Sequence, residues 1–119
     1  MPKLERTISG RYSFDEVLDY FHQNLLGGNI STSYEEGSQY HADALRCALR
    51  VYERYSIMGD GRLSLTLMLL ENGGKIFMSA ISAAGGRGVG KLVGWGEDRF
   101  LDDLRVLADQ LETDEEVKS

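Results

Sequence analysis

Hydrophobic and polar residues alternate along most of the stretch from residue 45 to residue 83, which is the period of a strand with one buried face. Glycine-rich segments at 59–61 and 72–74 divide the stretch and supply residues that tolerate positive φ, as hairpin turns require. The pattern therefore predicts an antiparallel meander of three strands. Its buried face is expected at the apolar positions of one parity, which in the first two strands are Leu45, Cys47, Leu49, Val51, Tyr55, Ile57, Leu63, Leu65, Leu67 and Leu69.

Two other segments carry apolar residues at helical spacing. Ser13 and Glu16 form a Ser-x-x-Glu capping box, which predicts a helix that begins near Phe14 and ends at Gly27-Gly28. The second helix is predicted over residues 97–112, with two acidic residues in its first turn. Its apolar face consists of Phe100, Leu101, Leu104, Leu107, Ala108 and Leu111.

The remaining segments are less regular. We expect strands over residues 3–9 and 30–36, a polar connection over 37–43, and a weak last strand over 89–95. Residues 42–55 also fit a helical spacing, but their β-branched and aromatic residues and the adjacent hairpin turn favour a strand over 45–58.

This order predicts an α+β domain, β-α-β-β-β-β(-β)-α, with an antiparallel sheet in two layers and both helices on one face. The same order is found in helix-grip domains. We expect a single domain over residues 1–112 and a frayed, charged tail over 113–119.

Composition narrows the choice of partners and of compartment. The net charge of −6 argues against nucleic acid and anionic membranes as partners, because both require a basic surface. The single cysteine, Cys47, has the apolar parity of its strand and is expected in the core; the absence of an internal disulfide suits a reducing compartment. The chain begins without an apolar signal segment, and its longest apolar run, 63–70, is too short to span a bilayer. We therefore expect a cytoplasmic protein.

Residues 85–91 (GGRGVGK) fit the pattern G-x-x-x-x-G-K of a phosphate-binding loop. Leu92 replaces the Ser or Thr that would bind Mg²⁺, and the glycines at 94 and 96 argue against a helix that begins directly after the loop. Nucleotide hydrolysis is therefore disfavoured. Contact of this loop with an anion remains open.

Glu53 is the one carboxylate among the apolar positions of its strand. A buried carboxylate requires a partner or a proton, which makes it a functional candidate if it lies in a cleft. Two structural alternatives are a β-bulge that turns Glu53 outward and a pair with an arginine such as Arg99.

Arg46, Arg50 and Arg54 occupy the opposite parity of the same strand. We expect a solvated face balanced by Glu35, Glu36 and Glu71 on neighbouring strands, with binding of an anionic partner as the alternative. The two histidines, His22 and His41, are far apart and have no ligand cluster around them, so the sequence predicts no metal site and no cofactor.

Three segments together resemble a small uncharacterised protein family of bacteria of the Firmicutes type: residues 51–56 (VYERYS), the glycine turn into residues 62–65 (RLSL), and residues 96–101 (GEDRFL). The resemblance implies a free-standing cytoplasmic domain of this length and no activity.

Because no acid–base pair or nucleophile can be named, no catalytic residue is predicted and an enzyme is disfavoured. We expect a non-catalytic module that binds a small apolar or amphipathic ligand between the sheet and the C-terminal helix. One alternative is a protein–protein or self-association module, such as a homodimer, that uses the open sheet face, with Tyr52, Met58, Met68 and Leu70 facing outward. The other is nucleotide or anion binding at the glycine loop. The residues expected at a ligand site are Glu53, Tyr55, Met78, Gly88, Gly90, Lys91 and Trp95.

Overall fold

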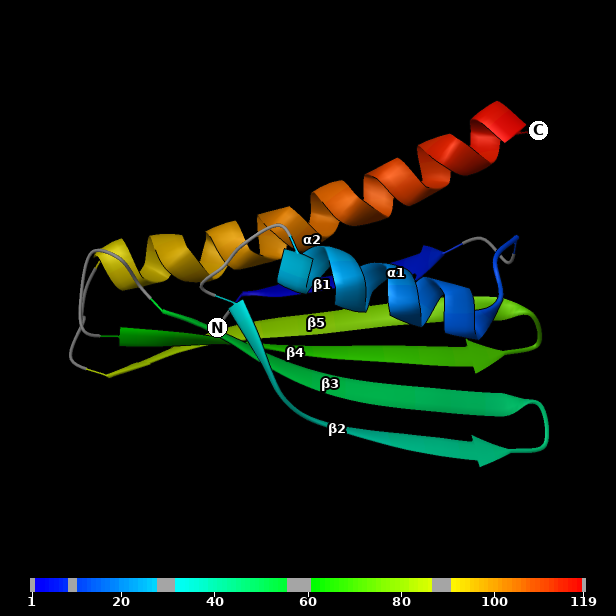
Figure 1. Ribbon diagram of the computed structural model, residues 1–119, viewed down its shortest axis with the longest axis horizontal. Coiled ribbons are helices and arrows are strands. Elements are labelled where there is room, and N and C mark those ends of the chain that lie inside the picture. Colours follow the sequence, from blue (N-terminus) through cyan, green and yellow to red (C-terminus); the bar gives the residue numbers. More distant parts are fainter. Residues whose placement is uncertain (1, 9–10, 28–31, 56–60, 87–90, 119) are drawn as a thin grey trace.

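The computed structural model describes residues 2–8, 11–27, 32–55, 61–86 and 91–118. Its elements are β1 (Lys3–Ile8), α1 (Phe14–Gly27), β2 (Thr32–Ala42), β3 (Leu45–Tyr55), β4 (Gly61–Asn72), β5 (Lys75–Gly86) and α2 (Lys91–Lys118). The strands form one antiparallel sheet in the order β1-β5-β4-β3-β2, and both helices lie over the same face of it (Figure 1). The predicted α+β class, the element order and the placement of the helices are confirmed.

The start of α1 is fixed by the predicted capping box. The backbone N–H of Ser13 donates to Oε1 of Glu16 at 2.9 Å, and the N–H of Glu16 donates to Oγ of Ser13 at 3.1 Å. Two amides of the first turn thereby find acceptors. The side of the helix that faces the sheet is apolar and buried, and it consists of Phe14, Val17, Leu18, Phe21 and Leu25.

The core lies between the sheet and the two helices. The leucines of β4 that the alternation predicts in the core are all buried. Helix α2 packs across both β4 and β5. The largest fully buried aromatic and apolar side chains of the strands and α2 are Tyr52, Phe100, Ile8, Leu65, Leu67, Leu69, Ile76, Met78 and Leu104. For β4 the predicted buried parity is therefore correct.

In β3 the predicted parity is wrong. Arg54 pairs with Leu63, Tyr52 with Leu65 and Ala48 with Leu69, and residues that pair across strands point to the same face. The even positions of β3 therefore face the helices, while its apolar odd positions face away. Tyr52, expected on the outside, is fully buried, and Cys47, expected in the core, is half-buried on the uncovered face.

Two predicted boundaries are also wrong. β2 continues to Ala42, so most of the expected connection over 37–43 is strand, and only a two-residue turn separates β2 from β3. α2 begins at Lys91 rather than near Glu97, so residues 91–95 are helical and form no last strand. Glycine weakens a helix by about 1 kcal/mol per residue. The amphipathic segment that follows already forms a helix, and extending an existing helix costs much less than starting one. The helix therefore continues back through Gly94 and Gly96 to Lys91 despite their low helix propensity.

The turn between β4 and β5 shows the expected glycine chemistry. Gly73 and Gly74 have φ values of 63° and 81° and connect Asn72 to Lys75 in a two-residue hairpin. Both values lie in the left-handed region, which favours glycine.

We expect Gly73→Ala to lower the free energy of unfolding by about 1 kcal/mol, because a side chain is strained at this φ. Gly27→Ala is the matched control: Gly27 ends α1 without a positive φ, and an added Cβ meets no atom within 4 Å. The control variant should be as stable as the parent or slightly more stable. Urea denaturation followed by circular dichroism measures the free energy of unfolding of both variants. An equal loss of stability in the two variants would contradict the requirement for glycine at the positive φ of residue 73.

Candidate functional site

The three arginines of β3, here called the arginine row, lie on the face that the helices cover. Each guanidinium stacks on an aromatic ring: Arg46 lies 4.6 Å from the ring centre of Phe14, Arg50 lies 5.5 Å from that of Tyr34, and Arg54 lies 4.1 Å from that of Phe100. Such contacts are attractive, and the aliphatic stems cover apolar surface at the same time.

Each arginine of the row also has a polar partner on a helix. Arg46 pairs with Asp15 at 2.8 Å and lowers the pKa of that carboxyl, and Arg54 pairs with Asp103 at 2.8 Å. Arg50 reaches Nδ1 of His22 at 2.9 Å. The expected solvated face, balanced mainly by acidic residues of neighbouring strands, is therefore wrong; the row connects β3 to both helices.

Arg54 is the most buried member of the row, with 8 % of its surface exposed. Its Nε donates to Oγ1 of Thr32 at 3.1 Å, in addition to the pair with Asp103 and the stacking on Phe100. A buried guanidinium is stable only when it is paired and hydrogen-bonded in this way. Arg54 thereby joins β2, β3 and α2.

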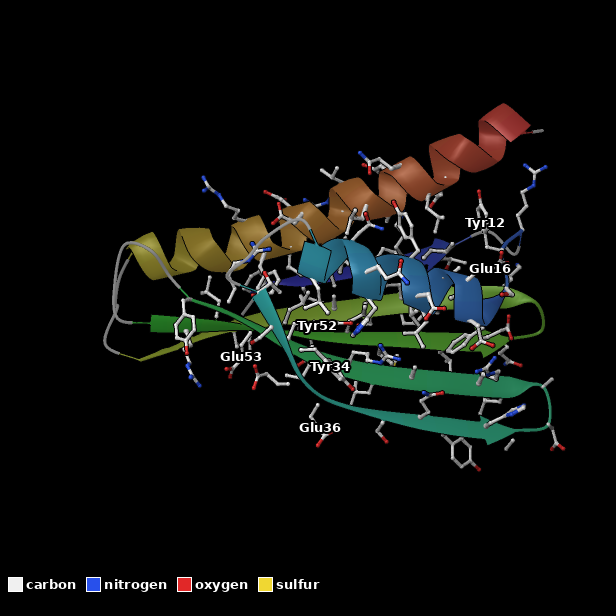
Figure 2. The ribbon with its side chains drawn as sticks, in the orientation of Figure 1. Tyr12, Glu16, Tyr34, Glu36, Tyr52 and Glu53 are labelled. Carbon is white, nitrogen blue, oxygen red and sulfur yellow. The ribbon has the colours of Figure 1, made fainter. Side chains whose placement is uncertain are left out.

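His22 is at the centre of a polar cluster between α1 and the sheet. Its Nδ1 lies 2.8 Å from the hydroxyl of Tyr52 as well as close to Arg50, and its ring contacts Tyr34 edge-on. Since a guanidinium has only donors, Nδ1 must accept, and the proton of the neutral ring is on Nε2. Burial and the nearby charge of Arg50 lower the pKa of His22, and burial raises the pKa of Tyr52. Figure 2 shows Tyr34 and Tyr52 side by side beneath α1.

The other face of the sheet, here called the open face, has no described element over it, because both helices lie on the opposite side (Figure 1). Apolar side chains dominate its centre. Ile81 is 41 % exposed, Leu49 is 39 % exposed and Tyr40 is 62 % exposed. The half-buried apolar residues around them are Leu45, Cys47, Val51, Met68, Leu70 and Phe77.

A hollow of about 490 Å³ lies at one end of the open face. Ser64 of β4 and the β5 residues at this point are small, whereas Tyr55 of β3 and Arg62 of β4 are large. Nη1 of Arg62 pairs with Oε1 of Glu53 at 3.1 Å, and Nη2 donates to the hydroxyl of Tyr55 at 2.9 Å. The lining consists of Glu53, Tyr55, Arg62, Ser64, Ala83, Ala84 and Gly85.

The structure brings together some of the predicted site residues and separates others. Glu53 and Tyr55 share the hollow, but Met78 is fully buried on the opposite face. Gly88 and Gly90 lie outside the described residues, and so do the side chains of Lys91 and Trp95. The anion site expected at the glycine loop falls on this segment.

The local structure around Glu53 agrees with one of the two alternatives that the sequence suggested, a pair with an arginine. The register of β3 with β4 is continuous through Glu53, so no bulge turns it outward, and its partner is Arg62 rather than Arg99. Arg62 and Ser64 line the hollow but are not among the residues predicted from the sequence. The ladder pairs them with Tyr55 and Glu53. Counting from a hairpin centred on residues 59–61 would have placed Leu65 opposite Tyr55 instead, so the glycine turn by itself did not give this register.

A second, smaller cavity of about 280 Å³ lies between α1, α2 and the end of β3. Arg54 and Asp103 contribute its charges, and two amide side chains and three apolar ones contribute the rest. The lining consists of Asn24, Leu25, Arg54, Asp103, Val106, Leu107 and Gln110.

Residues 1–112 match the model of a protein family described as a family of unknown function, DUF6054. This finding agrees with the resemblance to an uncharacterised family. The search of curated proteins gives no match. Within the described part of the chain, no helix has the length and apolar character needed to cross a membrane, and no three His, Cys, Asp or Glu side chains are grouped to hold a metal ion.

We expect the free energy of unfolding to fall as the pH drops below about 6.5, the ordinary pKa of histidine. Because the folded-state pKa of His22 is lowered, the unfolded chain binds the proton first, and stability is complete only above that value. His22→Asn keeps an acceptor near Nδ1 but does not titrate. Its stability should fall less than that of the parent between pH 7.5 and pH 5, as measured by urea denaturation; equal losses would contradict the role of His22.

Proposed function

The chain belongs to DUF6054, a family of unknown function, and from its geometry we propose that it is a non-catalytic module that self-associates through the open face of its sheet. The observation that carries the proposal is the orientation of β3. This strand directs three arginines toward the helices and Leu45, Cys47, Leu49 and Val51 toward the uncovered side.

Leaving such side chains in water is unfavourable. Full burial of a Leu, Val or Ile side chain contributes about 1.5–3 kcal/mol, and contiguous exposed apolar patches on soluble proteins commonly mark interaction sites. Leu49 and Ile81 are more than one-third exposed. Met68, which lies between them, and Phe77, further along β5, are only half-buried. A partner that covers this face would bury these apolar side chains, and the free energy of that burial would stabilise the complex.

The size and the charge distribution of the open face fit a second copy. Five strands about 4.8 Å apart and about ten residues long, at ~3.3 Å per residue, cover about 800 Å². A standard interface buries about 800 Å² on each partner. The charged side chains lie at the margins, on edge strands or strand ends: Lys3, Glu5, Glu36, Glu53, Arg62 and Lys75. An apolar centre with a polar rim is the usual anatomy of an interface.

We expect the wild-type chain to shift from monomer to dimer between low and high micromolar concentration. Leu49→Glu should weaken this dimer by at least about tenfold, because the new charge would be buried in the apolar part of the interface beside Met68. Val106→Glu is the matched control: Val106 is 52 % exposed but lies on α2, on the helix side. Sedimentation velocity gives the dissociation constants, and circular dichroism checks folding. A wild-type chain that stays monomeric at high micromolar concentration would refute self-association.

A second candidate function uses the cavity beside α2. We propose that it binds a small amphipathic carboxylate, which places the expected ligand between the sheet and the C-terminal helix but on residues other than those predicted. The support is a buried guanidinium, Arg54, next to the apolar side chains of Leu25, Val106 and Leu107. A carboxylate can replace that of Asp103, whose side chain is 48 % exposed, as the partner of Arg54.

Octanoate, with octanol as the uncharged comparison, tests this site by heteronuclear NMR. We expect octanoate to shift the amide signals around Arg54 and Leu107, and Asp103→Asn to bind it about tenfold more tightly, because the competing carboxylate is gone. Asp102→Asn is the matched control, since Asp102 is exposed and pairs with Arg105. Equal shifts with octanol, or no effect of Asp103→Asn, would refute the carboxylate site.

A further inference from the structure

We infer that the second copy binds in one orientation, in which the hollow of each open face receives the bulky end of the other. This inference rests on the proposed self-association and adds the direction and the register of the interface. It concerns the residues of β4 and β5 that face away from the helices.

The open face has a bulky end and a hollow end. In β5, Phe77 lies near the turn that follows β4, and Ala83 and Gly85 lie six and eight residues further along the same face. In β4, Leu70 pairs with Phe77 at the bulky end, and Ser64 pairs with Ala83 at the hollow end. The hollow of about 490 Å³ is the space that these small residues leave beside Tyr55 and Arg62.

Two sheets that pack face to face can be related by a two-fold axis that runs across the strands. This axis reverses the strand direction and places each strand over its own copy, so the interface is isologous. When it passes midway between Phe77 and Ala83, Phe77 lies over the partner's Ala83. The register then places Leu70 over the partner's Ser64 and Met68 over the partner's Thr66. In each pair a large side chain meets a smaller one.

The charges at the edge of the sheet agree with this orientation. Lys3 pairs with Ile81 in the β1–β5 ladder, and Glu5 pairs with Ser79, so the same axis places Lys3 of each copy opposite Glu5 of the other. Both side chains point to the open face, as Ile81 and Ser79 do, and they lie 3.6 Å apart within one chain. Two opposite-charge contacts at the rim fix the register without burying a charge at the centre.

The other possible axis, which runs along the strands, is less favourable. It places β4 over its copy in the same direction, so Leu70 meets Leu70 and Ser64 meets Ser64. The two hollows then face each other and stay unfilled, and atoms that line an unfilled space lose packing contacts. The filling of the hollows therefore distinguishes the two arrangements, whereas the charges at the rim alone do not.

A size swap tests the orientation. We expect Phe77→Ala, which removes the bulky side chain, and Ala83→Phe, which fills the hollow, each to weaken the dimer by at least about tenfold. The double variant Phe77→Ala/Ala83→Phe should recover the wild-type dissociation constant within about threefold, because a large side chain again meets a small one. Sedimentation velocity measures the four chains, and circular dichroism confirms that each is folded.

Cross-linking with a short bismaleimide provides a second measurement that does not depend on the swap. Cys47 pairs with Leu70, and Glu53 pairs with Ser64. Because Leu70 lies over the partner's Ser64 in the inferred orientation, native Cys47 lies opposite the partner's Glu53. Glu53→Cys should therefore give covalent dimers, whereas Phe77→Cys places its thiol near Cys47 of the other copy only in the alternative arrangement. Dimers from Phe77→Cys alone, without rescue by the swap, would overturn the orientation and leave self-association intact. A wild-type chain that is monomeric throughout would overturn both.

Discussion

The pairing of β3 with β4 is the constraint on which the rest of the structure depends. The leucines of β4 must be buried, and the ladder then assigns every residue of β3 to a face. That assignment places Ala48 and Tyr52 in the core, the arginine row beneath the helices and the apolar odd positions on the open face. Both the polar layer between strand and helix and the apolar surface on the other side follow from this one register.

The arginine row gives the helix layer its specificity. A purely apolar contact between a helix and a sheet allows the helix to slide and rotate. Each guanidinium, in contrast, contacts one particular ring and one particular polar partner, and a shifted helix would break these contacts. Arg46 and Arg50 connect to α1 at Asp15 and His22, and Arg54 connects to α2 at Asp103. The ion pairs contribute modestly because Asp15 and Asp103 are exposed to solvent. Their main contribution is to fix the positions of the two helices on the sheet.

Much of the fold could be predicted because its signals are local. The capping box at Ser13, the glycine turn at 73–74 and the leucines of β4 depend on neighbouring residues, and all three predictions are confirmed. The face of β3 is not a local property. Its own alternation favours burial of the odd positions, and only the ladder to β4 reverses that choice. Glu53 and Tyr55 line the same hollow, and the position of their partner, Arg62, depends on the same ladder.

The position of β1 has a consequence for how the chain reaches this structure. β2 to β5 are joined by consecutive antiparallel pairings, each between neighbours in the chain, whereas Ile8 of β1 pairs with Ile76 of β5. During synthesis the first strand has no partner until β5 has left the ribosome, and closing so long a loop is slow compared with forming a hairpin. We therefore expect the meander to assemble first, and β1 and α2 to complete the sheet and its helical cover last.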